Sequence, residues 1–170
     1  MHFVQTRIAT IDVYITFFVI LMYYFMYRYC SLSFYDKPLK KTLLPLGLCG
    51  ISMGFGVACK WTGAYAGIGL AIIFFATLFQ RYREYRYAKE RPEESTNGVS
   101  HESIIKTFPS ALIKTLLFCI VFFVMIPAGI YALSYIPFKD TFSEGFVQKI
   151  INNQQSMFSY HSELTATHPY

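Results

Sequence analysis

Residues 8–27 read IATIDVYITFFVILMYYFMY, a stretch in which Asp12 is the only charged side chain. An α-helix rises about 1.5 Å per residue, so about 20 apolar residues cross the roughly 30 Å hydrocarbon core of a membrane. Three more stretches have the same apolar character, residues 43–59, 62–79 and 111–135. The sequence therefore predicts an all-α integral membrane protein, with four transmembrane helices and a kink at Pro127.

The composition of the 170-residue chain excludes most other classes of protein. Hydrophobic residues make up 54% and charged residues only 15%, against about 25% charged in ordinary globular domains, which argues against a soluble enzyme. The net charge of +5 does not predict nucleic-acid binding, because the basic residues punctuate apolar stretches instead of forming one face. The four cysteines form no CxxC pair and are interpreted as small apolar residues, without a disulfide framework.

Basic residues set the predicted orientation. Residues 28–42 hold four of them and residues 80–109 hold six, so both segments are predicted to be cytoplasmic loops. Both ends of the chain then face the exoplasmic side. We expect residues 1–135 to form the four-span region and residues 136–170 to form an exoplasmic tail, with an amphipathic helix over 141–156.

A few polar and aromatic side chains gather at the predicted exoplasmic side, where a ligand could reach them. They are Arg7, Asp12, Lys60, Trp61, His161 and His168. Each also has a simpler interpretation: an arginine or lysine that extends to the interface, an aspartate paired with a neighbouring helix, and a tryptophan of the interfacial belt. The two histidines have no third ligand at zinc-type spacing, so no metal site is expected.

Glycines are frequent on both sides of Lys60 and Trp61. They are Gly50, Gly54, Gly56, Gly63, Gly67 and Gly69. Thin helices of this kind allow close helix packing, or leave room for a ligand beside a cation that suits an anionic headgroup.

Four strings together resemble the protein O-mannosyltransferase family in its bacterial form: QTRIATID at 5–12, KWTGAYAG at 60–67, QSMFSYHS at 155–162 and LTATHPY at 164–170. The resemblance implies a GT-C type membrane glycosyltransferase. Such an enzyme moves mannose from a polyprenyl (dolichyl) phosphate to Ser or Thr of an acceptor protein on the exoplasmic side.

The resemblance also implies roles for the polar residues. Lys60, followed by Trp61, would contact the lipid phosphate, Arg7 and Asp12 would shape the wall of that pocket, and His161 and His168 would line its outer rim. No metal or other cofactor is implied beyond the lipid-linked sugar donor. The implied partners are the bilayer, the donor lipid and the acceptor protein, with dimer formation left open. The expected location is the bacterial plasma membrane, or the endoplasmic reticulum in a eukaryote.

The chain departs from the family pattern in two ways. It is several times shorter than family members, and it contains no Asp-Glu dipeptide to supply the catalytic base. We therefore expect a partial chain that is inactive alone, with the base upstream of it. Two alternatives remain: a GT-C transferase with a lipid or glycan acceptor, and a non-enzymatic four-span scaffold or transporter piece.

Overall fold

Two compact units make up the chain, Met1–Tyr131 and Ala132–Tyr170, and each is described by itself. The structure is a computed structural model, and it describes the backbone of residues 11–35, 37–96, 98–137 and 145–163.

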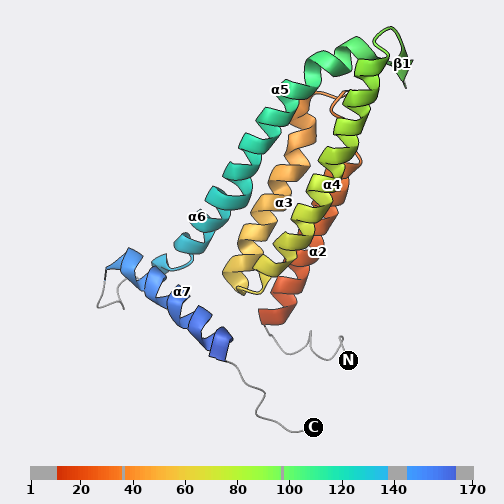
Figure 1. Ribbon diagram of the computed structural model, residues 1–170. Helices are drawn as coiled ribbons and strands as arrows, with labels where there is room; N and C mark the ends of the chain where they lie inside the picture. The colour runs from red at the N-terminus through yellow and green to blue at the C-terminus, as the bar shows by residue number, and fades with distance from the viewer. Residues whose placement is uncertain (1–10, 36, 97, 138–144, 164–170) are drawn as a thin grey trace. The chain divides into compact units, whose positions relative to one another are not determined.

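The first unit is built from long helices that lie side by side (Figure 1). They are α2 (Ile11–Cys30), α3 (Leu39–Cys59), α4 (Gly63–Glu90) and α5 (His101–Ile120), the last continued by the π-helix η1 (Val121–Met125) and by α6 (Ile126–Leu133). Within the described residues, four helices are long and apolar enough to cross a membrane, the fourth being the continuous stretch His101–Leu133. The predicted all-α fold with four transmembrane helices is confirmed.

The outer surface of this bundle is apolar, as a lipid-facing surface must be. Ile20, Ile72 and Val124, on three different helices, are each more than 60% exposed (65%, 67% and 62%). In water-soluble proteins, isoleucine and valine are among the residues that are most often fully buried. Their exposure indicates that hydrocarbon, and not water, surrounds the bundle.

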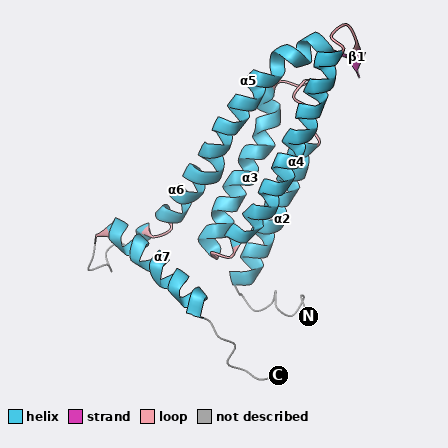
Figure 2. Cartoon of the chain, in the orientation of Figure 1, coloured by secondary structure: helices cyan, strands magenta, loops and turns pink. Residues whose placement is uncertain are grey.

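Two helices run well beyond the apolar stretches of the sequence. α4 continues to Glu90, and its 28 residues span about 42 Å, more than a membrane core needs. α5 begins at His101, ten residues before the predicted span. Between them, β1 (Ser95–Thr96) and β2 (Val99–Ser100) form a short antiparallel hairpin (Figure 2). Gly98, in the turn of this hairpin, has a positive φ of 77°. Segment 80–109 is thus mostly helical, because Arg, Glu and Lys are good helix formers and extend both helices.

The interruption expected at Pro127 takes the form of a π-helix. η1 ends two residues before the proline. Proline has no N–H to donate to the carbonyl four residues earlier, so the preceding turn widens to accommodate the ring.

Glycines of α3 allow this helix to pack closely against its neighbours in the core of the bundle. A Cβ on Gly50 would lie 2.3 Å from the carbonyl oxygen of Phe122, and a Cβ on Gly54 would lie 3.1 Å from the Cα of Pro127. Glycine therefore brings the backbone of α3 almost against η1 and α6, as the close-packing interpretation of these glycines predicts. Buried apolar side chains such as Met22, Leu46 and Phe74 fill the remaining space between α2, α3 and α4.

The second unit contains α7 (Phe146–Glu163). The amphipathic helix was predicted over 141–156, of which residues 141–144 lie outside the described part of the chain. The observed helix continues seven residues further, to Glu163. Val147, Ile151 and Phe158 are exposed on it, at 66%, 45% and 69%. Exposed apolar side chains on an otherwise polar helix are typical of helices that lie on a membrane surface.

Candidate functional site

Asp12 and Lys60 form an ion pair at one end of the bundle. The Lys60 Nζ lies 2.7 Å from Asp12 Oδ1, and the two side chains remain 48% and 67% exposed. Asp12 is in the first turn of α2, whereas Lys60 directly follows the last residue of α3. Because α2 and α3 run in opposite directions, the start of one meets the end of the other.

The backbone around Lys60 holds its side chain at the tip of the α3–α4 hairpin. Its φ and ψ are −156° and 129°, so the chain leaves the helix there, while its N–H still donates to the Gly56 oxygen. Its carbonyl accepts from the Gly63 N–H at 2.9 Å. A Cβ on Gly63 would lie 2.9 Å from the Gly56 carbonyl carbon, so this tight turn requires glycine at position 63.

Asp12 is favoured at its position by the helix to which it belongs. A carboxylate in the first turn lies near the positive end of the helix dipole, worth about 0.3–1 kcal/mol at an exposed site. The Thr16 hydroxyl donates to the Asp12 carbonyl oxygen at 2.7 Å and so braces the same turn. The negative charge that faces Lys60 is therefore fixed in place by α2.

The exposure of this pair limits its structural value. An ion pair between exposed side chains contributes about 0–1 kcal/mol. A lysine ammonium has three donors, and Asp12 accepts one of them. The ion pair therefore adds little to the stability of the bundle. Because the Lys60 ammonium is oriented but still accessible, it can bind a second anion.

Trp61 and Tyr65 stand next to the ion pair, on the turn and on the first turn of α4. Their rings meet edge to face with centroids 5.6 Å apart, and Tyr65 is 58% exposed. An aromatic pair at the end of a transmembrane helix is typical of the membrane–water interface. The cation of Lys60 therefore lies at headgroup depth and not in the hydrocarbon.

The structure brings together only some of the predicted site residues. Asp12, Lys60 and Trp61 lie at one end of the first unit, as the predicted topology requires. Arg7 and His168 lie outside the described residues. His161 belongs to α7 in the second unit, and its side chain is likewise outside the described part.

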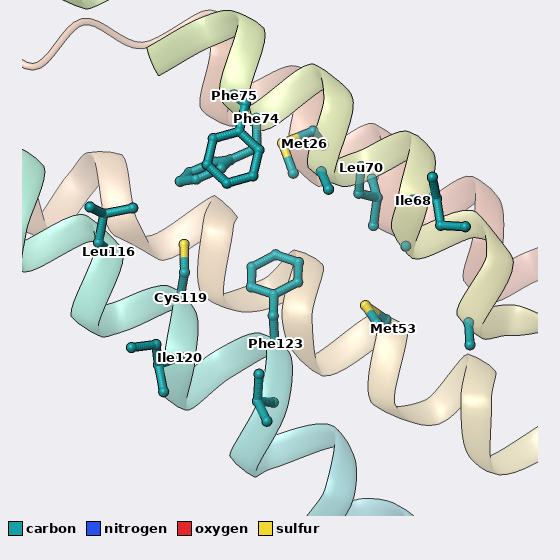
Figure 3. Close-up of a pocket in the computed structure, with 14 residues that line it drawn as sticks. Met26, Met53, Ile68, Leu70, Phe74, Phe75, Leu116, Cys119, Ile120 and Phe123 are labelled. Atoms are coloured by element: carbon teal, nitrogen blue, oxygen red, sulfur yellow. The ribbon is translucent and has the colours of Figure 1, made fainter. Parts of the chain in front are cut away.

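An apolar hollow of about 550 Å³ begins one turn beyond Lys60 and follows α4 (Figure 3). It starts at Ala64 and Gly67 and continues to Phe74, with Cys119 and Phe123 on the opposite wall. All fourteen residues that line it are apolar. A hydrocarbon chain is the ligand that such a wall accommodates.

The four cysteines Cys30, Cys49, Cys59 and Cys119 are free thiols. Within the described residues, no group of three His, Cys, Asp or Glu side chains is arranged to hold a metal ion.

Arg81, at the opposite end of the bundle, is a residue whose role the sequence analysis missed. It was counted among the six basic residues of the predicted cytoplasmic loop 80–109, but only 4% of it is exposed. Its guanidinium donates to the Tyr29 hydroxyl at 2.6 Å and to the carbonyl oxygens of Tyr29 (3.2 Å) and Leu32 (2.6 Å). It also lies over the Phe34 ring, 3.9 Å from the centroid.

These contacts make Arg81 a clamp on the end of α2. Carbonyls at a helix C-terminus have no partners within the helix, and a guanidinium at that end satisfies them and the helix dipole together. The sequence did contain a signal, because Arg81 follows Phe74, Thr77 and Leu78 at helical spacing. The structure shows that all four are buried.

Tyr35 completes this end of the bundle. Its hydroxyl donates to the Arg81 carbonyl oxygen at 3.2 Å. Burial raises the pKa of the Tyr35 hydroxyl far above its ordinary value, and the nearby Glu84 carboxylate adds to the rise while Arg81 opposes it. The phenol therefore stays protonated and remains a hydrogen-bond donor.

Comparison with known proteins gives one match. A family model described as dolichyl-phosphate-mannose-protein mannosyltransferase matches residues 1–142. No curated protein matches the chain. No solved structure matches it either.

Proposed function

Because the chain belongs to the dolichyl-phosphate-mannose-protein mannosyltransferase family, we propose that it is part of a membrane enzyme that transfers mannose from a polyprenyl phosphate to Ser or Thr. Family membership supports a membrane glycosyltransferase of the mannosyltransferase type. The four apolar helices agree with a multi-pass membrane protein. We also propose that the transfer takes place on the exoplasmic side of the membrane.

The observation that carries the proposal is the exposed ammonium of Lys60, held by Asp12 at 2.7 Å and followed by an apolar hollow. In the proposed reaction, the bond between the sugar and the phosphate oxygen breaks, and the polyprenyl phosphate leaves with the electron pair. A cation beside that phosphate stabilises the charge that develops on it. Asp12 positions the cation, and the hollow along α4 receives part of the polyprenyl chain.

The remaining roles follow the same scheme. Trp61 holds the turn at headgroup depth. Arg7, as part of the pocket wall, and His161 and His168, as contacts to the phosphate or the acceptor, keep the roles that the family resemblance implies. The acceptor hydroxyl must lose its proton to a base, and we assign that base to residues outside this chain, so the chain alone is inactive. The proposal requires no metal or other cofactor. We place the enzyme in the bacterial plasma membrane, or in the endoplasmic reticulum of a eukaryote.

The competing role for the ion pair is purely structural, a link between α2 and α3. A charge exchange separates the two roles, because Asp12→Lys combined with Lys60→Asp keeps an ion pair but removes the cation from position 60. If the pair is only a structural link, the exchanged protein should still transfer mannose. If Lys60 contacts the phosphate, the exchanged protein should not.

The test is mannosyl transfer from polyprenyl-phosphate mannose to a Ser/Thr-rich peptide, in membranes that contain the full-length protein. Loss of one donor that stabilises a developing negative charge costs about 10²–10³ in rate, so Lys60→Met should reduce transfer by about that factor. The charge exchange should be equally inactive, because it moves the ammonium from the α3–α4 turn to the first turn of α2. Lys89→Met, at an exposed lysine in the last turn of α4, is the matched control and should transfer normally.

Two results would overturn the proposal. Full transfer by Lys60→Met or by the charge exchange would leave the pair a structural link only. Wild-type membranes that label lipid but not peptide would favour a GT-C transferase with a lipid acceptor.

A further inference from the structure

A second hollow lies at the other end of the bundle, between the α2–α3 connection and α5. It measures about 410 Å³, and its lining includes the lysines Lys37 and Lys114 and the hydroxyls of Thr107 and Ser110. No carboxylate is among the nine residues that line it. Asp36 precedes Lys37 in the sequence and lies outside the described residues. The hollow therefore presents two cations and two hydroxyl donors to whatever enters it.

Lys114 is not at the centre of the membrane, although it belongs to an apolar helix. It lines the same hollow as Leu39, the first residue of α3. Further along both helices, a Cβ on Gly47 would lie 3.0 Å from the Phe118 ring, so α3 and α5 run in the same direction and Lys114 is level with the start of α3. Its ammonium thus lies at the interface.

An apolar groove of about 300 Å³ continues from this level along the same two helices. Lys40 is at its polar end, Leu44 and Ile51 lie on the α3 side, and Phe118 and Phe122 lie on the α5 side. On the continuous helix formed by α5 and η1, residues 107, 110, 114, 118 and 122 recur every three or four positions and so share one face. A cationic hollow and an apolar groove therefore follow one another along the α3–α5 seam, the contact line between these helices.

We propose that the α3–α5 seam binds an anionic phospholipid. Lys37 and Lys114 hold the headgroup phosphate, Thr107 and Ser110 donate hydrogen bonds to it, and one acyl chain lies in the groove beside Phe118 and Phe122. Basic pockets between transmembrane helices suit anionic headgroups. A soluble phosphate would leave the groove empty, so the amphipathic character of the seam selects a lipid.

This lipid is separate from the sugar donor. The seam begins at Leu39, and Lys60 follows the far end of the same 21-residue helix, about 30 Å away. The proposal therefore does not depend on mannosyl transfer. It assigns a structural or regulatory lipid to the end of the bundle where the basic residues gather.

The test measures binding of phosphatidylglycerol to the full chain in zwitterionic micelles, where phosphatidylcholine is the neutral comparison. Each lysine near a membrane surface contributes about a fivefold preference for an anionic lipid. Lys37→Gln with Lys114→Gln should therefore weaken binding about 25-fold. Lys41→Gln with Lys89→Gln removes the same charge from exposed lysines outside both hollows and should change binding little.

The groove is tested separately. Leu44→Gln places a polar group in it, whereas Leu117→Gln changes an equally exposed leucine of α5 that lines neither hollow (64% and 59% exposed). We expect only the first to weaken phosphatidylglycerol binding. The proposal is overturned if both lysine pairs weaken binding equally, or if wild type does not prefer phosphatidylglycerol to phosphatidylcholine. It is also overturned if glycerol 3-phosphate displaces the lipid at equal concentration, since the acyl chain then contributes nothing.

Discussion

Gly50→Ala is expected to destabilise the bundle, although the same change favours an isolated helix. The added Cβ would lie 2.3 Å from the Phe122 carbonyl oxygen and 2.8 Å from its carbonyl carbon. Ordinary contacts begin near 3.4 Å, so α3 and η1 must separate by about 1 Å. The obstacle is backbone, which cannot rotate away as a side chain does, and the separation loosens the packing of Gly47 and Gly54 on the same face.

Overpacking of this kind costs about 1–3 kcal/mol, against a gain of up to about 1 kcal/mol in helix propensity. For a chain of this length, about 1 kcal/mol moves the melting temperature by about 2–4 °C. We therefore expect Gly50→Ala to lower it by about 5 °C in detergent micelles, measured as the loss of the monodisperse peak after heating.

Gly129→Ala is the matched control, because it makes the same change inside α6, where a Cβ would meet nothing within 4 Å. It gains the helix propensity without the clash and should melt at the wild-type temperature or slightly above. If Gly50→Ala is as stable as Gly129→Ala, then α3 does not approach η1 as closely as the structure shows, and the reasoning fails.

Two further substitutions test the polar groups inside the bundle. Arg81→Met leaves the carbonyls of Tyr29 and Leu32 without their donor and should lower stability by about 3 kcal/mol. It should also speed cleavage at Lys37 by a lysine-specific protease, whereas Arg83→Met, at an exposed position, should do neither. Thr115→Val should raise the melting temperature by a few degrees, because the buried Thr115 hydroxyl has no hydrogen-bond partner and a methyl group of the same shape removes that cost. An unchanged or lower melting temperature would indicate that the hydroxyl is satisfied.

The sequence predicted the parts of the fold that depend on hydrocarbon length and charge. Four apolar stretches of sufficient length became four long helices, because a helix is the only way for a single segment to satisfy its backbone in a bilayer. The end of α4 and the start of α5 were less predictable. Hydropathy falls at Gln80, but residues 81–90 keep a high helix propensity, so the helix continues to Glu90.

The candidate site was predicted in outline for the same reason. Asp12 and Lys60 are 48 positions apart, and no local pattern joins them. Two consecutive crossings of the membrane, joined by one short loop, nevertheless place the start of the first span and the end of the second at one face. What the sequence could not give is the contact itself, because a separation of 48 residues does not show which side chains meet.

Comparison of Lys60 with Arg81 explains which cation is available to a ligand. The Arg81 guanidinium donates hydrogen bonds to one hydroxyl and two carbonyl oxygens at the end of α2. Because it is also buried between aromatic rings, an external anion cannot reach it. Lys60 has one carboxylate partner within the described residues and is about half exposed. Its ammonium is therefore oriented and still able to bind another anion, as an electrostatic contact to a leaving phosphate would require. An arginine at position 60 would keep the positive charge, but its guanidinium could donate two parallel hydrogen bonds to the Asp12 carboxylate. Lys60→Arg should therefore bind Asp12 more firmly and support less transfer than wild type.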